Sequence, residues 1–212
     1  MTENITVFTQ NSIRIVFDQK TVYFDPFKMK EETHDADVIF VTHDHYDHFS
    51  PDDIAMVACA KTILVVPKNM EKKAHSIDRL VDRIVTVKVN DAADIDGLNI
   101  ETVPAYNIMK PFHPKSAGNV GYIITAGGKR IYIAGDTDAT KEAKGVKCDI
   151  ALIPIGGTYT MDSKQAAELI NAIKPEVAIP THFGSAVGKM SDADDFAKLV
   201  DPSVKVENII QG

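Results

Sequence analysis

The sequence predicts an α/β fold, and two observations support that expectation. Short runs of apolar and β-branched residues alternate with segments of helical periodicity over most of the chain. Several of these runs end in histidine or aspartate, as in layered α/β folds whose functional sites form beyond the carboxyl ends of strands. With 212 residues, of which 44% are hydrophobic and 25% charged, the chain fits a single domain, 1–212, that can bury its own core.

The first third of the chain is rich in predicted strands. Residues 5–8, 12–17 and 21–24 are apolar or β-branched runs separated by polar turns, and they predict an antiparallel meander. Residues 38–42 read Val-Ile-Phe-Val-Thr and predict a buried strand that leads directly into a cluster of histidines.

Helices and strands are expected to alternate after this cluster. Ser50 is a suitable N-cap and Pro51 a suitable first helical residue, so a helix is expected to run to about residue 60. Further strands are expected at residues 63–66, 83–87 and 98–103, with a short helix at residues 69–75.

The second half continues the same pattern. Residues 120–125 and 129–134 flank Ala126-Gly127-Gly128, which predicts a tight hairpin. Asp162 is expected to cap a helix over 166–173, and Ser191 a last helix to about residue 200. The remaining strands are expected at residues 150–155, 177–180 and 204–206, the last at an edge.

The histidine cluster predicts a metal site. His43 and His45 are two residues apart, so both rings project from one face if strand geometry persists, and they can bind one cation. Asp47 and His48 follow where the chain must turn and can approach from another side, so a second metal site is plausible. Carboxylate oxygen together with imidazole nitrogen suits zinc, iron or manganese.

Two later segments bring residues of the same kind. Asp136 follows the predicted strand 129–134, and His182 follows the predicted strand 177–180. Alone, Asp136 would read as a turn aspartate and His182 as a hydrogen-bonded core histidine. Because ligands beyond the carboxyl ends of neighbouring strands can meet, we expect both to join the histidine cluster.

These segments resemble, in order, the motifs of the metallo-β-lactamase superfamily. They are His43-x-His45-x-Asp47-His48, Gly135-Asp136-Thr137 and Pro180-Thr181-His182. The resemblance implies a four-layer αββα sandwich with two divalent metal ions at one edge of its sheets, zinc first, with manganese or iron as alternatives. It assigns His43 and His45 to one ion, and Asp47, His48 and His182 to the other, with Asp136 bridging.

One stretch departs from the superfamily pattern. Most members place a further histidine after the strand corresponding to residues 98–103, where this chain has Tyr106. Either His113 completes the first metal site, or that site lacks a ligand and His113 binds substrate or is an exposed loop residue. Lys110 and Lys115 flank His113 in a proline-stiffened, basic loop, so these lysines, His113 and Tyr106 are expected to contact a small anionic substrate.

The resemblance implies hydrolysis of a small ester, lactone or phosphodiester by a bridging hydroxide activated by two metals. Asp47 would orient the hydroxide or take its proton, and Asp136 would hold the metals together. Asp25 and Asp44 are either acceptors for ligand histidines or turn aspartates. The nearest relatives would be compact hydrolases near the sugar-phosphate lactonases. The alternatives are a metal-binding or sensor protein without turnover, and a nuclease-type phosphodiesterase.

Composition and charge also limit the classes of partner that we expect this protein to bind. A net charge of −7 and a pI near 5.5 disfavour a broad nucleic-acid surface. No apolar run reaches the roughly 20 residues that cross a bilayer, and the start lacks signal-peptide features, so we expect a cytoplasmic protein without membrane contact. A homo-oligomer is compatible with the sequence. Cys59 and Cys148 suggest neither a disulfide framework nor a thiolate zinc site.

Overall fold

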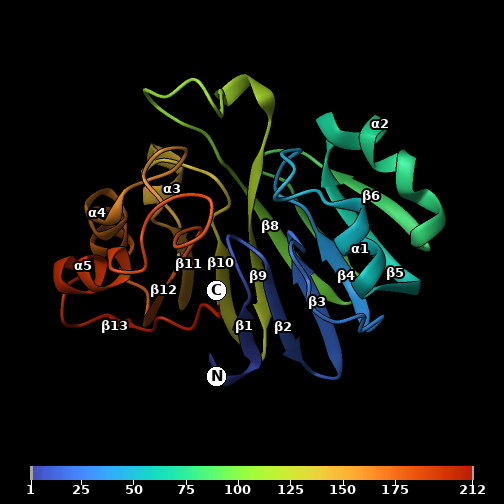
Figure 1. Cartoon of the computed structure of the whole chain (residues 1–212), viewed down its shortest axis with the longest axis horizontal. Coiled ribbons are helices and arrows are strands. Elements are labelled where there is room, and N and C mark those ends of the chain that lie inside the picture. The colour runs from blue at the N-terminus through green and yellow to red at the C-terminus, as the bar shows by residue number, and fades with distance from the viewer. Residues whose placement is uncertain (1, 212) are drawn as a thin grey trace.

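Two β-sheets lie face to face at the centre of the molecule (Figure 1). The computed structural model describes residues 2–211. The first sheet has the strand order β1-β2-β3-β4-β5-β6 and the second β13-β12-β11-β10-β9-β8-β7. The first sheet comprises β1 (Ile5–Val7), β2 (Ile13–Phe17), β3 (Lys20–Phe24), β4 (Ala36–Phe40), β5 (Ala58–Pro67) and β6 (Arg83–Val87). The second comprises β7 (Ala92–Ile95), β8 (Leu98–Pro104), β9 (Val120–Ala126), β10 (Lys129–Ile133), β11 (Ile150–Pro154), β12 (Val177–Thr181) and β13 (Lys205–Val206).

The strand pairing confirms the predicted local topology. Strands β1, β2 and β3 pair antiparallel as the expected meander, and β3 to β6 continue in parallel. Strands β9 and β10 form the predicted hairpin, and β10 to β13 are parallel with β13 at the edge. The carboxyl ends of the parallel strands of both sheets therefore point to the same side, where the loops that follow them can meet.

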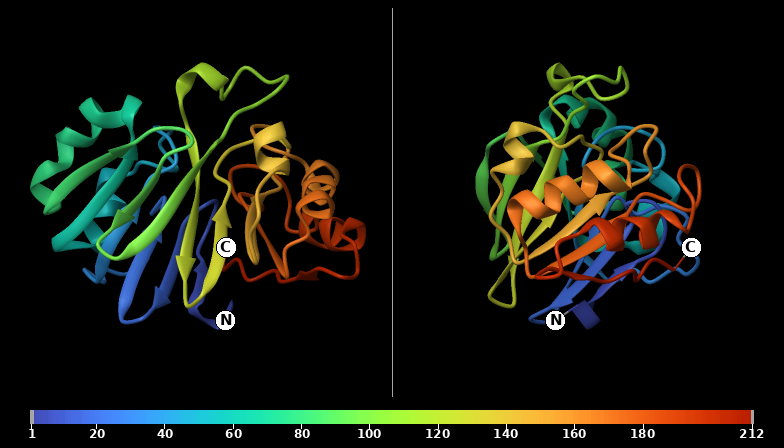
Figure 2. Two further views of the ribbon diagram at one scale, coloured as in Figure 1. Left: turned by 180° about the vertical axis from the view of Figure 1, so that it is seen from behind. Right: turned by 90° about the vertical axis from the view of Figure 1, so that its left-hand side faces the viewer.

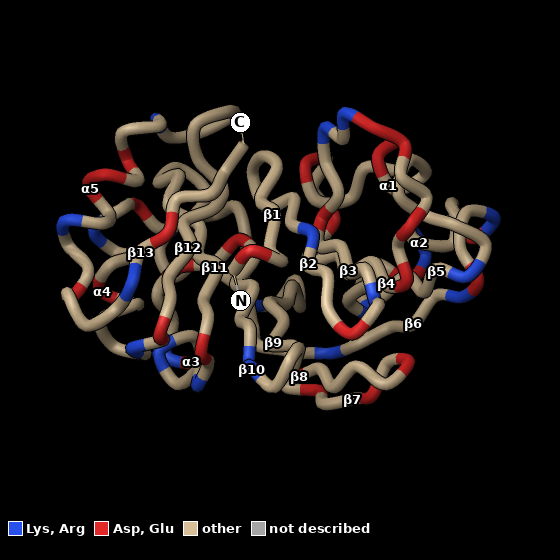
Figure 3. The backbone as a smooth tube through the Cα atoms, turned by 90° about the horizontal axis from the view of Figure 1, so that it is seen from below, with Lys and Arg blue, Asp and Glu red and all other residues tan. Residues whose placement is uncertain are grey.

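Helices cover the outer face of each sheet and complete the four layers of an αββα sandwich (Figure 2; Figure 3 shows the same arrangement from below). They are α1 (Pro51–Val57) and α2 (Glu71–Ala74) on the first sheet, and α3 (Lys141–Lys144), α4 (Ser163–Ile173) and α5 (Asp192–Leu199) on the second. Short 3₁₀ segments span Thr2–Asn4, Lys68–Met70, His75–Leu80 and Lys115–Ala117. No helix within residues 2–211 is both long enough and apolar enough to cross a bilayer.

Apolar packing holds the layers together. Between the sheets, the rings of Phe24 and Phe40 stack with centroids 5.0 Å apart, and Tyr122 of the second sheet packs 4.9 Å from Phe40. The buried Tyr122 hydroxyl donates a hydrogen bond to the Val41 carbonyl at 2.8 Å, which satisfies its polar end. A second core lies under α1 and a third under α4 and α5, so each helix layer buries one apolar face.

Three local expectations are corrected by the structure. Helix α1 ends at Val57, and β5 begins at Ala58, because Ala58 already pairs with Ala36 on β4 across a register shift. The short strand β7 and the single-turn helix α3 carry too little periodic apolar character to be recognised. Ser191 precedes α5 as expected, but its side chain makes no capping hydrogen bond. Ser50 and Asp162, by contrast, cap α1 and α4 as predicted.

Candidate metal centre

Four loops from both sheets meet at one edge of the sandwich. The loop after β4 carries His43, His45, Asp47 and His48 from the first sheet. The second sheet supplies His113 in the loop after β8, Asp136 after β10 and His182 after β12. The six predicted ligands and His113 come together as three overlapping groups whose ligand atoms lie within 4.8 Å of one another.

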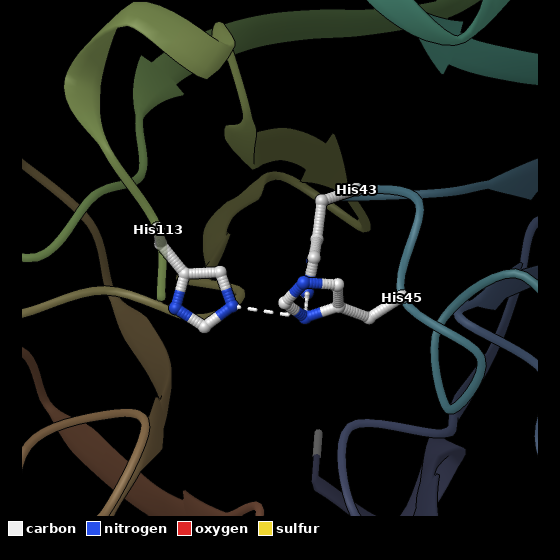
Figure 4. A group of neighbouring side chains, drawn as sticks. All are labelled: His43, His45 and His113. Atoms are coloured by element: carbon white, nitrogen blue, oxygen red, sulfur yellow. Dashed lines mark hydrogen bonds between the residues drawn. The ribbon is translucent and has the colours of Figure 1, made fainter. Parts of the chain in front are cut away.

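The first group consists of three imidazoles. The Nε2 atom of His43 lies 3.0 Å from Nδ1 of His45, and Nε2 of His113 lies 3.2 Å from the same Nδ1 atom. Figure 4 shows the rings of His113 and His45 turned toward each other from opposite sides of the site. His113 therefore lies beside His43 and His45 as the third imidazole of this group.

The second group consists of two imidazoles and a carboxylate. The Nε2 atoms of His48 and His182 lie 3.3 Å apart. Asp47 Oδ2 lies 3.4 Å from Nε2 of His182 and 3.7 Å from Nε2 of His48. His182 adopts a left-handed backbone conformation with φ of 56°, which turns its ring back toward the site at the end of β12.

The third group consists of His43, His48 and Asp136 and overlaps the other two, so that Asp136 lies between them. Its Oδ2 is 3.5 Å from Nε2 of His113, whereas its Oδ1 is 3.4 Å from Nε2 of His48 and 3.3 Å from Nε2 of His182. The preceding Gly135 has φ of 62°, and a Cβ there would lie 3.0 Å from Cβ of Thr42, so glycine allows this close approach. Each oxygen of Asp136 therefore faces a different group.

The nitrogen and oxygen atoms of these groups are suitable ligands for divalent cations. Oδ1 of Asp136 is buried and has no hydrogen-bond donor among residues 2–211. Tetrahedral zinc with ligands at about 2.0–2.1 Å would separate neighbouring ligand atoms by about 3.3 Å, close to the distances in both groups. Imidazole nitrogen and carboxylate oxygen together form the donor set expected for zinc, iron or manganese.

A buried carboxylate orients the ligand His48. Asp25 is fully buried, and its Oδ2 lies 2.7 Å from Nδ1 of His48, which leaves the Nε2 lone pair of that ring for the centre. Asp25 also accepts hydrogen bonds from the amide and hydroxyl of Thr42 and from Nδ2 of Asn11, at 2.7–2.8 Å. Asp25 thus has the expected supporting position, while Asp44 is exposed near Lys73 and contacts no ligand histidine.

The pKa values of His43 and His48 are shifted in opposite directions. Burial and the neighbouring imidazoles, His48 first, hold the pKa of His43 well below its ordinary value, so this ring stays neutral as a metal ligand requires. Burial also disfavours a charge on His48, but nearby carboxylates led by Asp136 and Asp25 raise the pKa of His48 to about 9. A metal ion at the second group must therefore displace a proton from His48.

A cavity of about 450 Å³ opens onto this centre. His45, Asp47, Asp136 and His182 line it on the side of the ligand groups. Tyr46, Phe112 and Tyr159 line its aromatic walls, and the rings of Phe112 and Tyr159 meet edge to face at 4.6 Å. A small molecule in this cavity would lie against the ligand groups and the aromatic side chains together.

Of the four residues expected to contact an anionic substrate, His113 lies in the first ligand group and the other three lie outside the cavity. Lys110 forms an ion pair with Asp138 at 3.0 Å and donates to the Thr160 carbonyl. Lys115 pairs with Glu142 at 2.6 Å, and the Tyr106 hydroxyl donates to the same carboxylate at 2.8 Å. None of these three side chains lines the cavity. Their contacts tie the loop after β8 to the second sheet and give no support to the expected anionic substrate.

Sequence reasoning missed Gln10 and Asn11. They lie in the turn between β1 and β2, which reads from the sequence as an ordinary polar connection. In the structure the backbone amide of His182 donates to the Gln10 carbonyl at 2.8 Å, and Asn11 contacts Asp25. The only signal for the involvement of Gln10 and Asn11 in the site is the position of this turn at the same edge of the sandwich as the other loops.

Replacing His113 with alanine is expected to lower the metal content of the protein toward one ion per chain. The first group would keep two imidazoles, too few for a closed site, whereas the second group is untouched. Metal analysis after gel filtration measures the change. His75→Ala is the matched control because this histidine is exposed and lies outside the ligand groups. Two tightly bound ions in His113→Ala would exclude His113 as a ligand.

Known proteins resemble this chain over most of its length. A family model described as a beta-lactamase superfamily domain matches residues 4–182. The chain is 32% identical over 202 residues to a UPF0173 metal-dependent hydrolase of Pyrococcus abyssi, covering 88% of each chain. A similar relative from Methanopyrus kandleri is 29% identical and covers 93% of this chain and 91% of its own.

Solved structures show the same architecture. A protein from Parabacteroides distasonis, named as a metal-dependent hydrolase, superimposes with a TM-score of 0.81 at 30% identity and covers 98% of this chain and 93% of its own. A metallo hydrolase of Ignicoccus hospitalis superimposes with a TM-score of 0.79 at 22% identity, covering 98% and 95% of the two chains, and shows the fold.

Proposed function

The chain belongs to the β-lactamase superfamily, and from this we infer that it is a metal-dependent hydrolase whose two-metal centre cleaves a small ester, lactone or phosphodiester. The observation that carries the proposal is the position of Asp136, whose two oxygens face two separate ligand groups at a cavity. A metal-binding protein without turnover would need neither a shared carboxylate nor an adjoining cavity.

We assign His43, His45 and His113 to one ion, Asp47, His48 and His182 to the other, and Asp136 to both. Divalent ions bound there would polarise a carbonyl or phosphoryl oxygen and lower the pKa of water toward neutrality. Zinc is the first choice, with manganese or iron as alternatives. Asp25 supports this centre by fixing the orientation of the His48 ring.

Asp47 is the group that we assign to proton transfer. Its carboxylate lines the cavity and lies 3.4 Å from Nε2 of His182 within the second ligand group, so a nucleophilic water in the cavity would lie within its reach. Burial alone would raise the pKa of Asp47, but the hydrogen bond from His182 and the charge of His48 outweigh burial and hold that pKa well below its ordinary value. Asp47 is therefore ionised at neutral pH and can accept a hydrogen bond that orients this water, and its low pKa favours passing a proton on over keeping it.

Removing the metals is expected to abolish turnover without unfolding the protein. The test uses protein purified without chelator and a panel of p-nitrophenyl butyrate, a simple lactone and bis(p-nitrophenyl) phosphate. Turnover should vanish after dialysis against a chelator and return with Zn²⁺ or Mn²⁺ but not with Mg²⁺, which binds imidazole poorly. Circular dichroism before and after chelation checks the fold. Metal-loaded protein that turns over no member of the panel would contradict the proposal.

A further inference from the structure

The side chain of Gln10 is buried without a protein partner. Gln10 is 0% exposed, and neither Oε1 nor Nε2 makes a hydrogen bond with any residue in the range 2–211. A buried amide is costly to leave without partners, so such a group persists only where something else compensates for its cost. Gln10 is one of the residues that line the cavity at the metal centre, together with Asp136 and His182. Because the amide has no hydrogen bond within the protein to break, it can turn toward a molecule inside that cavity.

The turn that carries Gln10 is held rigidly. The backbone carbonyl of Gln10 accepts a hydrogen bond from the backbone amide of His182 at 2.8 Å, and the φ of Gln10, 48°, lies in the left-handed region. The next residue, Asn11, donates to Asp25 at 2.7 Å and accepts from the Thr181 hydroxyl at 3.3 Å. The turn between β1 and β2 is thus fixed to both sheets beside the ligand groups, and this holds the backbone of Gln10 in place next to the cavity.

The cavity has no cationic side chain of its own. Among the residues that the structure describes, no lysine or arginine lines it. Lys110 and Lys115, the nearest basic residues in the loop after β8, are already paired with carboxylates. Apart from the ligand groups and Gln10, the lining consists of aromatic rings and the small apolar side chains Ala186 and Val187. Such walls favour the apolar part of a neutral molecule.

We propose that Gln10 is a specificity-determining residue that donates a hydrogen bond from Nε2 to an oxygen of a neutral carbonyl substrate. The substrate class is an ester or lactone whose apolar chain or ring packs against Phe112 and Tyr159. This role of Gln10 rests on the proposed function and narrows it. Phosphodiesters and substrates with a charged tail are expected to be poorer substrates than neutral esters or lactones. The amide can in addition accept a hydrogen bond through Oε1, which suits a substrate that bears an N–H or O–H group.

The kinetic test compares Gln10→Met, Gln10→Asn and the exposed control Gln211→Met. Methionine keeps the length and removes the amide, whereas asparagine tolerates a positive φ and withdraws the amide by one methylene. Wild type is expected to prefer p-nitrophenyl butyrate to bis(p-nitrophenyl) phosphate in kcat/KM. Gln10→Met should lower kcat/KM for the butyrate by about tenfold or more and for the phosphodiester much less, with metal content unchanged. The kcat/KM of Gln10→Asn for the butyrate should lie between those of wild type and Gln10→Met. The kcat/KM of Gln211→Met should match that of wild type.

Two further measurements separate recognition from a structural role. Gln10→Met should keep or raise Tm, because an apolar group replaces a buried amide without partners. Hexanamide, a neutral amide with an apolar chain, should raise Tm of metal-loaded wild type and not of Gln10→Met. Equal Tm shifts in both proteins would overturn the inference, as would a phosphodiester preference in wild type or an equal loss on both substrates. If wild type hydrolyses nothing, the proposed function fails, and the hexanamide comparison still decides the role of Gln10.

Discussion

Replacing Asp136 with alanine is expected to abolish hydrolysis and to reduce the metal content of the protein. The two oxygens of Asp136 face the two ligand groups, so the change removes one metal-ligand atom from each group. We expect kcat to fall by about 10³-fold or more, which corresponds to about 4 kcal/mol of lost transition-state stabilisation. The fold should survive, because the apolar strands behind the centre supply the core. Steady-state kinetics and metal analysis measure the two effects together.

Asp44→Asn is the matched control for this change. Asp44 lies between the ligand histidines His43 and His45, but its side chain is 56% exposed and belongs to none of the ligand groups. The control should keep both metal content and kcat within about twofold of wild type, as expected for a surface substitution. Full activity in Asp136→Ala with two metals bound would refute the shared role of Asp136.

Replacing Asp25 with alanine should have the largest effect on stability. The change leaves Nδ1 of His48, the amide and hydroxyl of Thr42 and the amide of Asn11 buried without their common acceptor. Removing one partner of such a buried charged network costs about 3–5 kcal/mol. For a chain of this size that corresponds to a fall in Tm of roughly 6–20 °C. Because His48 also loses its orientation, metal affinity should drop by about 10–100-fold.

Chemical denaturation and metal titration measure these two effects. Asp37→Ala provides the comparison, because Asp37 accepts a single backbone hydrogen bond, from Thr21, and is only partly buried. Its removal should cost about 1 kcal/mol and leave metal binding unchanged. An Asp25→Ala variant as stable as Asp37→Ala would mean that the buried donors find other acceptors.

The fold was predictable wherever local chemistry and tertiary pairing agree. Apolar runs such as residues 150–155 and capping residues such as Asp162 specify their elements without help from the rest of the chain. The α1–β5 boundary was not predictable, because pairing of Ala58 with Ala36 extends β5 beyond what its own residues favour. The edge strand β7 carries two alanines and an aspartate, too weak a pattern to recognise.

The candidate site was predictable to the extent that strands deliver its residues. His43, His48, Asp136 and His182 each follow an apolar strand, so their convergence followed from the order of the strands. His113 lies nine residues beyond the end of β8, and only the path of its loop brings it to His45. Gln10 could not be assigned, because a buried, unpartnered amide is a property of the folded chain and leaves no mark in the sequence.

The distribution of the centre over both sheets also determines when it can form during folding. His48 and His182 are 134 residues apart, and the Thr181–Asn11 contact beside them joins residues 170 apart. Bringing such distant segments together requires closure of a very long loop, and its entropy must be offset by packing of the two sheets first. Unlike a zinc finger, whose metal organises a short chain, this centre is expected to be completed late, so metal capture would report that a newly made chain has finished folding.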